Sequence, residues 1–245
     1  MMGARPAAGH NEAMGSRVGR ACVAACWLLW IGVQAGAGDP LIPDISYSQY
    51  GLGPRGWMFS LWAVLLGIGP LLLWRARPVP GRAPILCLAV GTVGTLVMAV
   101  VRTDAGGLQQ SLQAQVHAAG AIAAMVALPT GIVLALRFAP TRVARTAAGL
   151  GLASLAGLLL IGAAAAGVDI LGIGQQDAWA FWQGFTVLVD MLLLGLYAVA
   201  VGSLPVRPAA GRPDAPPPAP RVPAVPDGPA GSAPERATSQ RPHAG

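Results

Sequence analysis

The stretch VRTDAGGLQQSLQAQVHAAG, residues 101–120, is a polar segment between two long apolar runs. Its notable polar side chains are Arg102, Asp104, Gln110, Gln113 and His117. The flanking runs cover residues 84–101 and 116–138. As helices rising about 1.5 Å per residue, both are long enough to cross about 30 Å of hydrocarbon. The segment is therefore predicted to connect two transmembrane helices at one face of a membrane.

The composition is typical of a chain whose surroundings are mostly lipid. Apolar residues make up 54% of the 245 residues and charged residues only 11%, whereas a soluble domain has about 25% charged residues. The pI near 10.2 does not indicate nucleic-acid binding, because the arginines lie in short clusters between apolar runs. The low content of charged residues predicts a multi-pass protein of the cell membrane. All 16 basic residues are Arg, which is typical of a GC-rich genome, so we expect the source to be a high-GC bacterium.

Six apolar runs have the length of a membrane span. They cover residues 21–38, 57–74, 84–101, 116–138, 146–168 and 178–204. Backbone polar groups in lipid must pair within their own segment, so each run is predicted to be a helix. The fold class is therefore all-α: a polytopic membrane protein whose six transmembrane helices form one compact bundle over residues 21–204.

Two interpretations of the first run remain open. Residues 1–20 are polar and are expected to be a disordered cytoplasmic N-terminus. The run that follows is either a retained transmembrane helix or a signal peptide that ends at the small residues Ala35, Gly36 and Ala37. We favour the retained helix.

The arginines predict the orientation. If successive connections alternate sides, 14 arginines fall on one side and only Arg55 and Arg102 on the other. The positive-inside rule then places both termini in the cytoplasm. Residues 205–245 hold 12 of the 22 prolines and are predicted to be a disordered cytoplasmic tail. That tail is a candidate ligand for a polyproline-binding partner protein, or simply an unstructured extension.

Polar residues within the apolar runs are the candidates for a site. Gln183, Thr186 and Asp190 share one face of the last helix. Asp190 lies about twelve residues into that helix and hence roughly 18 Å deep. An isolated carboxylate at that depth costs at least about 2.5 kcal/mol, so it should face the bundle interior. Thr92 and Thr95 are predicted at a similar depth.

These positions suggest a polar cleft that opens outward and binds a ligand. Its predicted site residues are Arg102, Asp104, His117, Gln183 and Asp190. The competing interpretation is that the polar groups only join helices through hydrogen bonds, each worth about 0.6–2 kcal/mol. Close helix packing is expected along the small residues Gly149, Ala153 and Gly157.

Several short motifs resemble a known family. They are SYSQYGLGPRG leading into WMFSLWAVLLG, VRTD at the end of the third run, and VHAAGAIAAM at the start of the fourth. Together they resemble the six-helix membrane family named domain of unknown function 998, over about residues 20–204. The resemblance implies a compact integral membrane protein with no established activity. It also implies that residues 48–53, Asp104 and His117 are shared with relatives.

Four function classes remain. The first is binding or moving a small or lipidic ligand; Arg102 would attract an anionic headgroup. The second is a structural or assembly partner in the cell envelope. A membrane-embedded hydrolase is less favoured, because the sequence has no HExxH or GxSxG motif. Haem binding is disfavoured because His10 and His243 lie in the tails. We expect no catalytic residue, metal site or cofactor.

Overall fold

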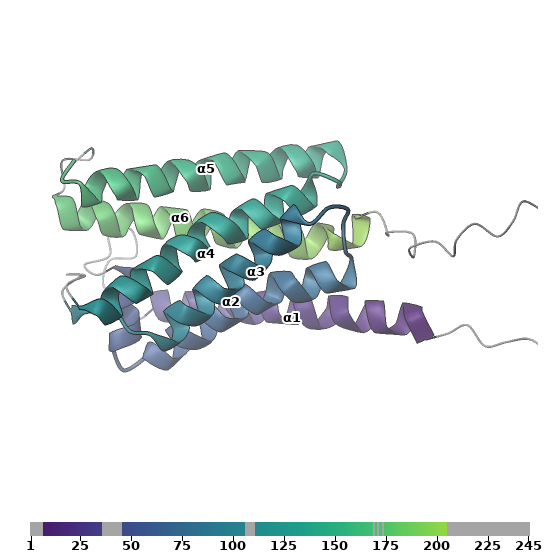
Figure 1. Cartoon of the computed structure of the whole chain (residues 1–245), viewed down its shortest axis with the longest axis horizontal. Coiled ribbons are helices and arrows are strands. Elements are labelled where there is room, and N and C mark those ends of the chain that lie inside the picture. The colour runs from purple at the N-terminus through teal and green to yellow at the C-terminus, as the bar shows by residue number, and fades with distance from the viewer. Residues whose placement is uncertain are drawn as a thin grey trace, which may run out of the picture. The chain divides into compact units, whose positions relative to one another are not determined.

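The computed structural model describes residues 7–35, 46–105, 111–168, 170, 172 and 174–204, with residues 7–13 as backbone only. These residues form six long α-helices and two short 3-10 helices, and they contain no strand. In chain order they are α1 (Ala7–Gln34), η1 (Tyr47–Leu52), α2 (Gly56–Ala76), α3 (Ala83–Val100), α4 (Leu112–Leu136), α5 (Thr141–Ala165), α6 (Gln175–Ala200) and η3 (Val201–Ser203) (Figure 1). The predicted tail over residues 205–245, and Gln110, lie outside the described residues.

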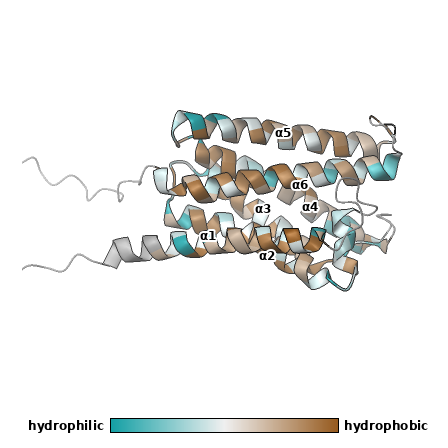
Figure 2. Ribbon diagram, turned by 180° about the vertical axis from the view of Figure 1, so that it is seen from behind, coloured by the Kyte–Doolittle hydropathy of each residue, from teal (hydrophilic) through white to brown (hydrophobic). Residues whose placement is uncertain are grey.

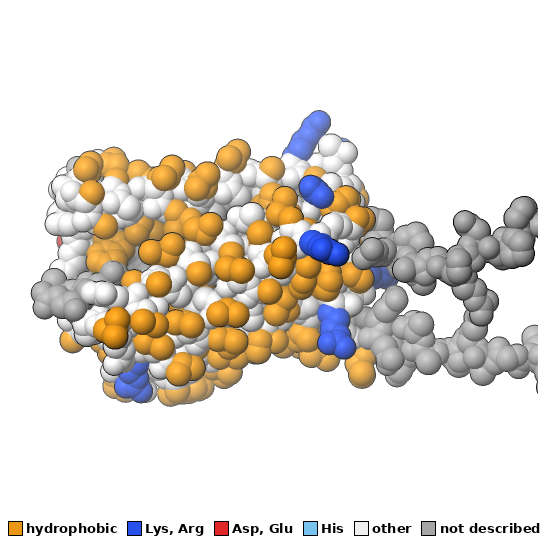
Figure 3. All heavy atoms as spheres, viewed as in Figure 1, with side chains coloured by type: hydrophobic (Ala, Val, Ile, Leu, Met, Phe, Trp, Pro, Cys, Tyr) orange, Lys and Arg blue, Asp and Glu red, His pale blue; other side chains and the backbone are white. Residues whose placement is uncertain are grey.

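All six α-helices are long and apolar enough to span a membrane. Consecutive helices run side by side along the bundle (Figure 1), and the closest partners are α1 with α2, α3 with α4, and α5 with α6. Hydrophobic residues predominate along the helices (Figure 2), and apolar side chains cover much of the face of the molecule seen in Figure 3. Val199 is 81% exposed and Val100 80% exposed. This apolar exterior suits lipid, and the predicted all-α membrane bundle with six spanning helices is confirmed.

The helices extend further than the apolar runs. α1 begins at Ala7, so residues 7–20 are helical rather than irregular. α4 begins at Leu112, and α5 begins at Thr141 with Arg142 and Arg145 exposed in its first turns. Polar side chains at a helix end can lie beyond the hydrocarbon, so an apolar run marks the lipid-covered part of a helix and not its full length.

The arginines gather at one end of the bundle (Figure 3). The connections α2–α3 and α4–α5 lie at that end, and they carry Arg75, Arg77, Arg82 and Arg137. The opposite end has Arg55 before α2 and Arg102 after α3. This distribution supports the predicted orientation, with the arginine-rich end in the cytoplasm.

Glycines allow the backbones of α3 and α4 to approach closely. A Cβ atom built on Gly94 would lie 2.5 Å from the Gly120 carbonyl oxygen and 2.7 Å from the Ala124 nitrogen. A Cβ on Gly120 would lie 2.9 Å from the Gly94 carbonyl oxygen. Backbone atoms cannot move aside as a flexible side chain can, so glycine is required at both positions for the two helices to touch.

The small-residue stripe predicted on α5 is only partly used. Gly157 packs against the Thr186 hydroxyl of α6, but a Cβ on Gly149 would meet no atom within 4 Å. The prediction for Gly149 is therefore wrong. The buried residues of α5 are instead Ala147, Ser154, Gly157 and Ala164.

We expect Gly94→Ala to destabilise the protein by about 1–3 kcal/mol, because the added methyl group overpacks a backbone contact. Gly149→Ala is the matched control: its methyl group enters open space, and Ala favours a helix over Gly by up to about 1 kcal/mol. Thermal unfolding of both variants in detergent measures the difference. Equal melting temperatures for the two variants would contradict the glycine contact.

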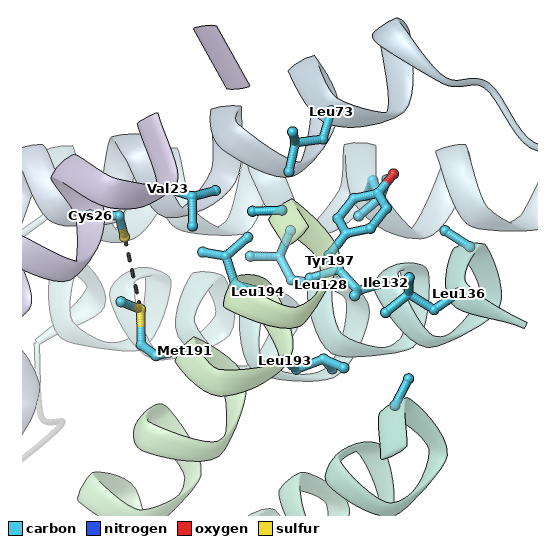
Figure 4. Close-up of a cluster of buried hydrophobic side chains, with 14 of the residues drawn as sticks. Val23, Cys26, Leu73, Leu128, Ile132, Leu136, Met191, Leu193, Leu194 and Tyr197 are labelled. Atoms are coloured by element: carbon cyan, nitrogen blue, oxygen red, sulfur yellow. Dashed lines mark hydrogen bonds between the residues drawn. The ribbon is translucent and has the colours of Figure 1, made fainter. Parts of the chain in front are cut away.

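The core lies where α6 meets α1, α2 and α4. Met191, Leu194 and Tyr197 of α6 are all 1% exposed or less. Figure 4 shows the Cys26 thiol of α1 directed at Met191, with the two sulfur atoms 3.9 Å apart. Cys26 is fully buried. α1 is therefore an integral part of the packing of the bundle.

This packing supports the interpretation of residues 21–37 as a retained helix. We expect the intact mass of protein purified from membranes to include these residues, because their removal would expose the α1-facing side of α2 and α6. Intact-protein mass spectrometry measures this directly. A mass that corresponds to a chain beginning at residue 38 would establish cleavage instead.

Candidate functional site

Three hollows lie among the described residues of the bundle, and one of them is at the η1 end. The η1-end hollow, about 370 Å³, lies among α4, α5, α6 and the residues around η1. The α4–α5 groove, about 390 Å³, continues between those two helices. The Asp190 chamber, about 40 Å³, is enclosed by η1, α2, α3, α4 and α6. Met125 of α4 lines all three, so they meet at this side chain.

The groove opens sideways between the helices. α4 and α5 make far fewer contacts with each other than α3 does with α4 or α5 with α6. Val126 on one wall is 50% exposed, and Leu152 and Leu155 on the other are 68% and 52% exposed. In a membrane these side chains face lipid, so the groove is accessible from within the bilayer.

η1 closes the end of the Asp190 chamber. Tyr47, which is only 4% exposed, donates its backbone N–H to Gln183 Oε1 at 2.9 Å. The Tyr47 hydroxyl accepts a hydrogen bond from the Gln34 side-chain amide. Burial raises the pKa of the Tyr47 phenol, so this side chain stays neutral as it covers the chamber.

The backbone of η1 is held by its own polar side chains. Gln49 Oε1 accepts the Ser46 N–H at 2.8 Å, which supports the first turn of the short helix. Tyr50 stacks edge-on against Tyr47 with ring centroids 5.6 Å apart. η1 is thus stabilised by the Ser46–Gln49 hydrogen bond at its own start and by the Tyr47–Gln183 hydrogen bond to α6.

We expect Gln183→Ala to loosen η1, because it removes the acceptor for the Tyr47 N–H. A net hydrogen bond is worth about 0.5–1.5 kcal/mol, so amide hydrogen exchange over residues 47–52 should accelerate by about three- to tenfold. Gln176→Ala, an exposed residue of the same helix, is the control and should leave exchange unchanged. Unchanged exchange in Gln183→Ala would show that η1 is held in another way.

His117 lines the η1-end hollow and is 3% exposed. Its Nδ1 lies 2.6 Å from the Val101 carbonyl oxygen. A carbonyl only accepts hydrogen bonds, so Nδ1 carries the proton, and in the neutral ring Nε2 is an acceptor. Nε2 is buried and has no hydrogen-bond partner among the described residues.

Asp190 and Ser154 face each other across the α5–α6 contact, beside the hollows. Asp190 lines the Asp190 chamber, Ser154 lines the groove, and the Ser154 hydroxyl lies next to the carboxyl group. Neither Ser154 Oγ nor Asp190 Oδ1 meets hydrogen-bond geometry with any partner in the described residues. A chamber of about 40 Å³ has room for water, which needs about 10–15 Å³ per molecule by this measure.

Two predicted site residues lie apart from the hollows. Arg102 is exposed, and neither Arg102 nor Asp104 lines any of the three hollows. Asp104 instead accepts the Ser111 hydroxyl at 2.6 Å and the Ser111 N–H at 2.9 Å. Ser111 in turn caps α4 by accepting the Ala114 N–H at 3.0 Å. Asp104 therefore organises the start of the helix that carries His117.

The predicted site is brought together only in part. Gln183 lines both the η1-end hollow and the Asp190 chamber, so it connects His117 with Asp190. Thr92, expected at a depth similar to that of Asp190, donates its hydroxyl to the Gly67 carbonyl at 2.9 Å and joins α3 to α2. The Thr186 hydroxyl donates to the Trp182 carbonyl at 2.8 Å. The Thr92 hydroxyl therefore joins two helices, and the Thr186 hydroxyl bonds within its own helix.

Three lining residues were not identified from the sequence. Ser154 is the clearest omission, because a single polar residue in a run of Gly, Ala and Leu is itself a signal for a buried contact. Tyr47 lies in a loop-like segment whose burial no local pattern predicts. Met125 sits in an apolar helix, where its place at the junction depends on how α4 and α5 diverge.

Comparison with protein families identifies the chain. The model of the family described as Protein of unknown function (DUF998) matches residues 18–200. The chain belongs to this family. The match covers all six spanning helices apart from the start of α1. A search of curated proteins and a search of solved structures each found no match.

The DUF998 chain has no obvious metal site in its described part. Within residues 14–35, 46–105, 111–168, 170, 172 and 174–204, no group of three or more His, Cys, Asp or Glu side chains could hold an ion. His117, Gln183, Ser154 and Asp190 are among the polar residues that line the hollows.

Proposed function

We propose that this DUF998 protein binds one amphiphilic molecule from the surrounding bilayer, with the polar end in the η1-end hollow and the apolar end in the α4–α5 groove. The observation that carries the proposal is the junction at Met125, where a hollow that carries several polar side chains, including His117 and Gln183, meets a groove lined almost wholly by apolar side chains. An amphiphile has the same division between its two ends.

The size of the site supports this proposal. The two larger hollows measure about 370 and 390 Å³, and small-molecule sites usually measure about 300–1,000 Å³. Such sites combine apolar walls with a few polar groups that fix orientation. Here those groups are Gln183 and His117, while the groove supplies Leu, Val and Met side chains.

The charges indicate the side of the membrane on which the η1-end hollow lies. The arginine-rich end is the cytoplasmic end by the positive-inside rule, so the η1-end hollow opens on the outer side of the membrane. Arg55 and Arg102 are the only arginines assigned to that side. The ligand would enter sideways through the gap between α4 and α5, where the lining residues 125–134 and 148–158 lie toward the arginine-rich end of the two helices. Its polar end would reach the η1-end hollow past Met125.

Met125→Trp tests this function, because the larger side chain fills the point where the three hollows meet. We expect the variant to carry at most about one tenth of the lipid that co-purifies with the wild type. A tenfold loss of affinity corresponds to about 1.4 kcal/mol of binding free energy. Native mass spectrometry of the full chain in mild detergent, together with lipid extraction, measures bound lipid.

Leu159→Trp is the matched control for that experiment. Leu159 is on α5, is 67% exposed, and lines none of the three hollows. This variant should carry as much lipid as the wild type, and melting temperatures verify that both variants are folded. The proposal fails if folded Met125→Trp carries the wild-type amount, or if the wild type binds nothing when offered total membrane lipid.

A further inference from the structure

We infer that the ligand is a hydroxyl-bearing lipid with an uncharged headgroup and a single acyl chain. The inference rests on the proposed function and adds the chemical class of the ligand. It departs from the sequence-based expectation that Arg102 attracts an anionic headgroup.

The first argument is the hydrogen-bonding state of His117. Nδ1 is committed as a donor to the Val101 carbonyl at 2.6 Å, so Nε2 of the neutral ring needs a donor from elsewhere. Nε2 is buried and without a partner in the described residues. A buried polar atom left unpaired costs about 1–3 kcal/mol. A hydroxyl group in the η1-end hollow would supply the missing donor.

The second argument is the absence of charge around this hollow. Its polar side chains are Ser46, Ser48, Thr103, His117 and Gln183. No arginine or carboxylate is among the described residues that line it, and Arg102 is exposed elsewhere. Burying an ionised headgroup without an opposite charge is very costly. Neutral hydroxyls, which both donate and accept, match these side chains.

The third argument concerns the apolar end. The only polar side chains that line the α4–α5 groove in the described residues are Thr130 and Ser154. Thr130 already donates its hydroxyl to the Val126 carbonyl at 2.6 Å. From His117 to Leu134, the residues of α4 that line the hollows extend roughly 25 Å along the helix axis. One leaflet of hydrocarbon is about 15 Å deep, so the hollows can hold a complete acyl chain.

The width of the site favours one chain over two. The groove is bounded by α4 on one side and α5 on the other, and Gly151 of α5 remains close to α4. A Cβ on Gly151 would lie 2.8 Å from Val133 Cγ2. Val133 also lines the groove. The groove therefore narrows at the end nearer the α4–α5 connection, where Gly151 and Val133 bring the two helices together. A narrowing gap between two helices suits a single chain.

The test compares two probes that differ only by a phosphate group: monooleoylglycerol and its phosphate ester. Each is added to the purified full-length protein in detergent, and native mass spectrometry measures occupancy against concentration. We expect one monooleoylglycerol per chain, bound at least about tenfold more tightly than the phosphate ester. That ratio corresponds to about 1.4 kcal/mol.

Two substitutions of His117 separate its structural bond from its role toward the ligand. The amide of His117→Asn can still donate to the Val101 carbonyl from the Nδ1 position but provides no acceptor at the Nε2 position. His117→Gln provides an acceptor near the Nε2 position but loses the donor to Val101. We expect His117→Asn to melt like the wild type and to lose the preference for monooleoylglycerol, whereas His117→Gln should keep more of that preference.

Arg102→Ala is the control for headgroup charge. Because Arg102 lines none of the three hollows, binding of both probes should be unchanged in this variant. The inference is overturned if the phosphate ester binds as tightly as monooleoylglycerol, or if folded His117→Asn keeps the full preference. If neither probe binds the wild type and Met125→Trp does not reduce co-purifying lipid, the proposed function itself fails.

Discussion

The contact between Gly94 and Gly120 fixes the arrangement on which the rest of the bundle depends. In lipid there is no hydrophobic force that drives helices together, so close backbone packing and interhelical hydrogen bonds must do so. The glycine pair brings the backbones of α3 and α4 into contact. The His117–Val101 bond at 2.6 Å then joins the start of α4 to the end of α3. α4 therefore packs closely against α3, and α5 packs closely against α6 at Gly157.

The α4–α5 groove is a consequence of the close packing of α4 against α3 and of α5 against α6. α4 packs Gly120 and Gly131 against α3, and α5 packs Gly157 against α6, whereas the α4–α5 contact is sparse. The gap between them is lined by Val, Leu and Met side chains. Lipid surrounds such a gap, and an apolar opening there costs nothing in exposure to water. A bundle made of tight helix pairs therefore produces a lateral opening where two pairs meet.

The sequence predicts the six spanning helices well, because apolar length is a direct consequence of bilayer thickness. It predicts their ends poorly. Gln113 and Arg142 lie outside the apolar runs, and both are in helices that continue past these runs. Lipid determines which residues are apolar, whereas backbone hydrogen bonding and caps such as Ser111 determine where a helix begins.

The candidate site is predicted only in part, for a similar reason. Helical periodicity places Gln183 and Asp190 on one face of α6, and both line the Asp190 chamber. Periodicity cannot tell which neighbour a face meets. Thr92 was expected at a depth similar to that of Asp190, and its face meets α2, where its hydroxyl donates to the Gly67 carbonyl. Arg102 was expected at the mouth of a cleft, yet the chain leaves α3 in a direction that exposes it.

The polar groups in the helices fall into two sets that differ in what they require. Thr92, Thr130 and Thr186 donate to nearby carbonyl groups and need nothing more. His117 Nε2 and Asp190 Oδ1 are buried without a partner in the described residues, and both residues line hollows that meet at Met125. Unmet hydrogen-bonding capacity beside open volume is what a binding site requires before its ligand arrives.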